Sequence, residues 1–194
     1  MNAVVVFNDV KEACRELQVQ LMEHSQGRAN DEQLACILAS WSCGLAGLPV
    51  FLGLEHEQFR ALLAYHYPGF DARKLEQPQA QPNPERWHER NDLLTLLLQD
   101  RAGKSESEKW IAGIVSTACM AQDHLWQDLG LWSRKDLSSL LQRNFPALAA
   151  RNDRDMKWKK FFYKQLCNAE GIYICRAPSC EICPDYLECF GSEE

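Results

Sequence analysis

The amino-acid sequence predicts an all-α fold: a single helical domain of about six or seven helices that ends in an irregular cysteine-rich loop. Apolar residues recur three and four positions apart over most of the chain, and the sustained alternation typical of strands is hard to find. Capping residues precede these apolar runs, and glycine or proline follows them. The 194 residues, 46% of them hydrophobic, can bury one sizeable core.

Two helices are expected before residue 50. The first begins after Asn8 or Asp9 and ends before Gly27, with an apolar face made of Val10, Cys14, Leu17 and Leu21. The second is capped at residue 30 or 31 and continues through LACILASWSCGLAG to the helix-breaking residues 47–49.

A third helix and a linker follow. The helix, EHEQFRALLAYHY, should stop at the Pro-Gly pair of residues 68–69. Three prolines then favour an extended, solvated linker at about residues 76–84. Asn83 and Pro84 are typical of an N-cap and a first helical position, so they predict a fourth helix, ended by Gly103.

The longest amphipathic run lies in the second half of the chain. Ser105 and Glu108 match a capping box, which opens the run KWIAGIVSTACMAQDHLWQDLG, and Gly130 is expected to close it. Residues 133–136 resemble a weaker box, which begins a short helix that Pro146 ends.

The last predicted helix is basic. Asn152 or Asp153 can cap the run DMKWKKFFYKQLCNAE, which continues to Gly171. We therefore divide the chain into a helical body, residues 1–150, and a C-terminal region, residues 151–194, that holds this helix and the cysteine-rich loop.

Composition excludes several classes of protein. The formal net charge of −6 argues against a dedicated binder of duplex DNA. No signal peptide and no apolar stretch of membrane-spanning length is present, so we expect a cytoplasmic protein that neither enters a membrane nor binds nucleic acid. A reducing compartment disfavours disulfides, so clustered thiols there more often bind metal or work in catalysis.

Four cysteines crowd together near the end of the chain, in the stretch CRAPSCEICPDYLECFG. Cys175, Cys180, Cys183 and Cys189 follow the spacing C-x4-C-x2-C-x5-C, and two prolines lie between them. Proline fixes backbone angles and removes amide donors, which suits a loop folded around an inorganic centre. These four residues are the candidate metal and cofactor ligands.

Three centres could occupy this loop. Structural zinc sites usually pair two C-x2-C units across a dozen or more residues, and only one such unit is present. The C-x4-C-x2-C opening instead matches the first three ligand positions of plant-type ferredoxins, which favours an iron–sulfur cluster. A zinc ion and a disulfide or redox pair remain as alternatives.

Other residues are weaker candidates for metal binding: Cys119, His124 and Cys167. Each also has a structural interpretation, as a core thiol, a hydrogen-bonded histidine and a buried helical cysteine. Positive charge near thiolates would steady an anionic cluster, although the basic side chains of the last helix could equally be its solvated face. These are Arg154, Lys157, Lys159, Lys160 and Lys164.

Four stretches together resemble one known family. ACMAQDHLWQDLGL, the FPALAARN turn, MKWKKFFYKQLC and the cysteine motif are similar to the NifQ family, the molybdenum-handling proteins of nitrogen fixation. The resemblance is dense over residues 105–191 and slighter before them.

The resemblance implies a cytoplasmic iron–molybdenum–sulfur protein that donates molybdenum for assembly of the nitrogenase iron–molybdenum cofactor. It further implies that Cys175, Cys180, Cys183 and Cys189 ligate a cluster of the [4Fe-4S] or [3Fe-4S] type. The expected partners are the cofactor-maturation scaffold, the nitrogenase iron protein, and molybdate or a molybdenum–sulfur species.

Two rival interpretations are of different classes. A helical DNA glycosylase can carry a similar late cysteine loop, but the sequence lacks a Gly-rich hairpin beside a catalytic Lys and Asp. A helical interaction module with a structural zinc site bound by four cysteines is the other. Because no nucleophile with a matched base is evident, we expect a carrier rather than an enzyme.

Overall fold

The computed structural model describes residues 3–76, 86–171 and 186–193 of the chain. Within these ranges it contains ten α-helices and no strand, which confirms the all-α class. Seven of the helices have eleven or more residues, and the other three are single turns. The helices are α1 (Ala3–Glu23), α2 (Asp31–Ser42), α3 (His56–His66), α4 (Trp87–Gln99), α5 (Ser107–Ala118), α6 (Leu125–Asp128), α7 (Arg134–Asn144), α8 (Pro146–Ala150), α9 (Trp158–Glu170) and α10 (Tyr186–Phe190).

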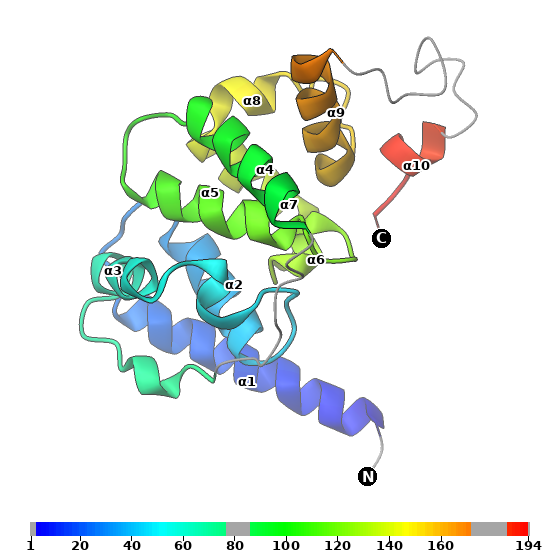
Figure 1. Cartoon of the computed structure of the whole chain (residues 1–194). Helices are drawn as coiled ribbons and strands as arrows, with labels where there is room; N and C mark the ends of the chain where they lie inside the picture. Colours follow the sequence, from blue (N-terminus) through cyan, green and yellow to red (C-terminus); the bar gives the residue numbers. More distant parts are fainter. Residues whose placement is uncertain (1–2, 77–85, 172–185, 194) are drawn as a thin grey trace.

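The helices pack around one continuous core (Figure 1). Helix α1 packs along α2, α3 packs against α5, and α4 lies between α5 and α9. The largest side chains that are fully buried come from elements throughout the chain: Trp41, Tyr67, Phe145 and Phe162. The burial of such large apolar surfaces is the main source of stability in a fold of this kind. No helix in the described ranges is both long and apolar enough to span a bilayer.

The expectation of one long helix from Ser105 to Gly130 is wrong. Helix α5 ends at Ala118, and α6 begins at Leu125. A continuing helix would bond the carbonyl groups of Met120 and Ala121 to amides four residues later. Instead, the Arg86 guanidinium donates to Met120 O at 2.8 Å and the Lys159 ammonium donates to Ala121 O at 2.9 Å. Side chains from α9 and from the residue before α4 therefore bind the two carbonyl groups that a longer α5 would have used.

Several helix boundaries also differ from the predicted ones. Helix α1 begins earlier, at Ala3, and α2 ends at Ser42 rather than near residue 47. The early end of α2 follows from Gly44, whose φ of +71° leaves the helical region. Helix α4 begins at Trp87 rather than Pro84. Most of the predicted Pro-rich linker, including Asn83 and Pro84, lies outside the described residues.

The basic helix begins later than predicted. Helix α9 starts at Trp158, because Asn152 closes a tight turn instead of capping a helix: its side-chain oxygen accepts from the Met156 amide at 2.9 Å. Its predicted end at Gly171 is confirmed, with φ of +69° at that glycine. Trp158 is buried on the core side of α9.

Of the two predicted capping boxes, the one at Ser133 is confirmed, and the one at Ser105 forms only in part: the Ser105 hydroxyl accepts from the Ser107 amide at 3.2 Å and not from that of Glu108. The Ser133 hydroxyl accepts from the Asp136 amide at 3.1 Å and caps α7. The Glu108 carboxylate accepts from the amide of Ser105 at 3.1 Å, and it also accepts from Gly103 and Lys104. Satisfying amides at a helix start in this way stabilises the helix.

Candidate functional site

The structure describes one of the four motif cysteines. Cys189 lies in the single turn α10, half-buried, where it packs with Phe190 against the edge of the core. The part of the predicted irregular loop that carries Cys189 is therefore helical. Cys175, Cys180 and Cys183 lie outside the described residues.

Two basic residues that precede α9 hold α10 against the helical body. The Lys157 amide donates to Cys189 O at 2.8 Å, and the Lys157 ammonium donates to Leu187 O at 3.4 Å. The Arg154 guanidinium lies 5.7 Å from the centre of the Phe190 ring, within the range of a cation–π contact. The sequence singled out both residues for their charge, and the structure places them beside the fourth cysteine.

A buried carboxylate, Glu193, forms a second attachment four residues after Cys189. Its side chain is 6% exposed, and it forms ion pairs with Arg134 Nε at 3.0 Å and with His124 Nδ1 at 3.7 Å. Arg134 also donates to the exposed Asp155 carboxylate at 2.6 Å, and these two acids raise the pKa of its guanidinium. Arg134 and Glu193 are not among the residues predicted from the sequence, since no local pattern links residues so far apart.

The weaker candidates separate into different environments. Cys119 is 1% exposed, and burial raises the pKa of its thiol to about 12, so it is a neutral core residue at the end of α5. Cys167 is half-buried in α9. His124 caps α6 and reaches the C-terminal segment through Glu193. His124 thereby contacts the segment that carries Cys189.

Lys159 is not part of a solvated face. Its ammonium forms an ion pair with the buried Asp128 carboxylate and is 18% exposed. Burial raises the pKa of Asp128, and the nearby Lys159 charge opposes that rise. This lysine therefore joins α9 to α6, beside the loop that separates α5 from α6.

The donors that the structure describes do not form a metal site by themselves. No group of three or more His, Cys, Asp or Glu side chains within the described ranges could hold a metal ion. Cations nevertheless contact the segment that carries Cys189: Lys157 at Leu187 O, Arg154 at the Phe190 ring, and Arg134 at the second attachment. Positive charge stabilises thiolates and anionic thiolate-bound centres, so these surroundings fit such a group.

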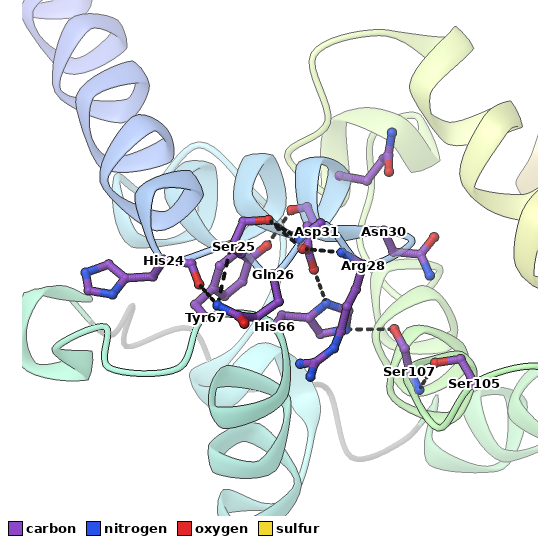
Figure 2. A network of polar contacts seen from close by, with 12 residues as sticks. His24, Ser25, Gln26, Arg28, Asn30, Asp31, His66, Tyr67, Ser105 and Ser107 are labelled. Atoms are coloured by element: carbon purple, nitrogen blue, oxygen red, sulfur yellow. Dashed lines mark hydrogen bonds and ion pairs between the residues drawn. The ribbon is translucent and has the colours of Figure 1, made fainter.

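A separate polar network lies deep in the body (Figure 2). His66 Nδ1 contacts Asp31 Oδ1 at 2.5 Å, and its Nε2 contacts the Ser107 hydroxyl at 2.9 Å. The other Asp31 oxygen accepts from the Ser25 hydroxyl at 2.5 Å and from the Arg28 amide at 2.8 Å. The network therefore joins α2, α3 and α5.

This order of Ser, His and Asp is that of a hydrolytic triad, but its burial makes it structural. Ser107 and His66 are 0% exposed, so no substrate could reach the hydroxyl. Burial lowers the pKa of His66 against the opposing Asp31 charge, which favours a neutral ring. Burial would raise the pKa of Asp31, but hydrogen bonds led by that from Ser25 hold it below its usual value.

Fold and site together describe an all-helical protein whose C-terminal, cysteine-bearing turn is attached to a cationic edge of the body. Comparison with known proteins gives the family: the NifQ family model matches residues 33–191. The match begins well before the region where the sequence resemblance is dense.

Individual relatives agree with the family model. The chain is 43% identical to "Protein NifQ" of Azotobacter vinelandii over 86% of this chain and 90% of that protein. It is 39% identical to "Protein NifQ homolog" of Sinorhizobium fredii, over 82% of this chain and 71% of that protein, and 37% identical to "Protein NifQ" of Rhodobacter capsulatus, over 82% and 87%. The chain therefore belongs to the NifQ family, a family of nitrogen fixation. No solved structure matches it.

Proposed function

We propose that this protein carries an iron–molybdenum–sulfur cluster and donates molybdenum for biosynthesis of the nitrogenase iron–molybdenum cofactor. The observation that carries the proposal is the C-x4-C-x2-C-x5-C motif, whose last cysteine, Cys189, is attached to the body among cationic side chains. Membership of the NifQ family supports the same function.

In this proposal Cys175, Cys180, Cys183 and Cys189 hold an iron–sulfur cluster of the [4Fe-4S] or [3Fe-4S] type. The cluster supplies a sulfide-rich surface for molybdenum, which is the cargo. The chain's own residues bind and orient the cluster: the four thiolates are the ligands, and Lys157 and Arg154 place positive charge on the turn that carries Cys189, at Leu187 O and at the Phe190 ring. Of the weaker molybdenum-ligand candidates, His124 lies beside the C-terminal segment, whereas Cys119 lies buried in the core.

The proposed partners follow from the delivery role. The recipients would be the cofactor-maturation scaffold and the nitrogenase iron protein, and the molybdenum source would be molybdate or a molybdenum–sulfur species. We propose that the protein acts in the cytoplasm as a carrier rather than as an enzyme.

The test is metal analysis of protein purified without oxygen. Wild-type protein should be brown and contain iron and molybdenum, with an electron paramagnetic resonance signal from the cluster. Cys183→Ser should lose the iron and the signal while the far-ultraviolet circular dichroism stays helical. Cys36→Ser is the matched control, because burial raises the pKa of Cys36 to about 12 and makes it a poor ligand.

Two results would contradict the proposal. Full retention of iron and molybdenum in Cys183→Ser would exclude the ligand assignment. A colourless wild-type protein with one zinc ion per chain would instead support the alternative, a helical interaction module stapled by a structural zinc site.

A further inference from the structure

We propose that Arg134 and Glu193 are positioning residues for Cys189. In this proposal their ion pair fixes the backbone of the fourth cysteine on the helical body, whether or not metal is bound. The inference rests on the proposed function, because it treats Cys189 as a cluster ligand. It assigns a role to two residues outside the cysteine motif, one at the start of α7 and one after α10.

The first observation is the contrast between two acids of the same segment. Glu188 is exposed, whereas the Glu193 side chain is 6% exposed and lies 3.0 Å from Arg134 Nε. Burying a carboxylate costs free energy unless a cation or hydrogen-bond donors compensate it. Arg134 is the cation that compensates the buried Glu193 carboxylate, so removing Arg134 should release Glu193 from the body.

The second observation is that α10 is short and buries little apolar surface. A helix of five residues is not stable by itself in water, since helix nucleation is unfavourable. Its exposed apolar side chains contribute little burial: Leu187 is 73% exposed and Tyr186 is 39% exposed. The half-buried Cys189 and Phe190 supply its apolar contact with the core. Polar contacts must therefore carry much of the attachment.

The polar contacts bracket the cysteine. Two residues before Cys189, the Lys157 ammonium donates to Leu187 O at 3.4 Å, and the Lys157 amide donates to Cys189 O itself at 2.8 Å. Four residues after Cys189, Arg134 forms an ion pair with Glu193. Two attachments so close in sequence fix the position of the intervening backbone. A ligand that is already in place loses less conformational entropy when it binds, so the anchor should slow loss of whatever Cys189 binds.

The chain provides a matched control for Arg134. Its guanidinium has a second carboxylate partner, Asp155, which is 72% exposed and lies 2.6 Å from Nη1. Asp155→Asn removes the charge of that partner and leaves the Glu193 pair intact. Arg134→Lys keeps the positive charge and serves as the conservative variant. Arg134→Gln and Glu193→Gln each break the proposed anchor without a large change in side-chain volume.

The first experiment uses metal-free, full-length protein and measures amide hydrogen exchange. Arg134→Gln and Glu193→Gln should each speed exchange of the Lys157 and Gly191 amides, which donate to Cys189 O and Leu187 O, by about tenfold or more. Asp155→Asn should match wild type, and Arg134→Lys should recover part of the protection. Unchanged exchange in both Gln variants, with wild-type unfolding midpoints, would overturn the anchor.

The second experiment measures iron release to a chelator from anaerobically loaded protein. Arg134→Gln should release iron about fivefold faster or more than Asp155→Asn, starting from the same iron content and spectrum. Equal rates would refute the positioning role even if the anchor exists. Wild-type protein that binds no iron would refute the proposed function instead, and the exchange experiment would still decide whether the anchor is present.

Discussion

Two buried carboxylates in this protein do different work. Asp31 lies inside the body, where hydrogen bonds from Ser25, His66 and Arg28 satisfy it. Glu193 lies at the edge of the body, where it pairs with Arg134 and His124 and holds a short terminal segment. The comparison indicates that similar burial need not mean similar importance for folding: the first carboxylate joins three core helices, and the second attaches a single turn at the edge of the body.

Removing the Asp31 carboxylate should have the largest effect. In Asp31→Ala, the His66 ring and the Ser25 hydroxyl lose their partner inside the core, so we expect the free energy of unfolding to fall by about 3 kcal/mol or more. Urea denaturation followed by circular dichroism measures it. Asp71→Ala removes only an exposed cap and ion pair, so it should lower the midpoint far less. An equal midpoint for both variants would show that the buried network contributes little.

Acid should destabilise the protein through the same network. The folded pKa of His66 lies below 6.5 because burial disfavours its charged form, so the unfolded chain binds the extra proton first. Stability should therefore fall as the pH drops below about 6.5, and the low pKa of Asp31 adds a further loss below about 3.8. His66→Asn should be less stable at neutral pH but lack the first of these two slopes. A wild-type stability that stays level between pH 7 and 5 would contradict this assignment.

Breaking the peripheral pair should have the smallest effect on global unfolding. Because α10 is a single turn attached at the edge of the body, we expect it to separate before the core unfolds, and Glu193→Gln should lower the free energy of unfolding by less than about 1 kcal/mol. Limited proteolysis should nevertheless cut after Lys157 or near Leu187 sooner in this variant than in wild type. A large loss of global stability would mean that the C-terminal segment is part of the core folding unit.

Local signals allowed most of the fold to be predicted from the sequence. Helical spacing gave the all-α class, and short-range capping such as that of Ser133 or Gly171 gave correct boundaries. The break between α5 and α6 could not be predicted, because it depends on Arg86 and Lys159, which come from distant segments. The spacing of apolar residues predicts which side chains are buried. It does not predict where side-chain donors from other segments will bind backbone carbonyl groups that a helix would otherwise use.

The candidate site divides in the same way. The cysteine spacing pointed to Cys189, and the charge of the last helix pointed to Lys157 and Arg154. The Arg134–Glu193 pair is invisible in the sequence, as are the contacts of His66 with residues 35 and 41 positions away. Long-range pairs of this kind are set by tertiary packing, which produces no repeating pattern in the amino-acid sequence.

The loop between α5 and α6 has a wider consequence for how this chain can be dissected. Because the length of α5 is limited by cations from α9 and from the residue before α4, a fragment spanning residues 105–130 would lack those stops. Such an excised piece would be free to wind on past Ala118, and it would point His124 in a new direction. The C-terminal end of α5 is therefore set by tertiary contacts and forms only in the folded protein.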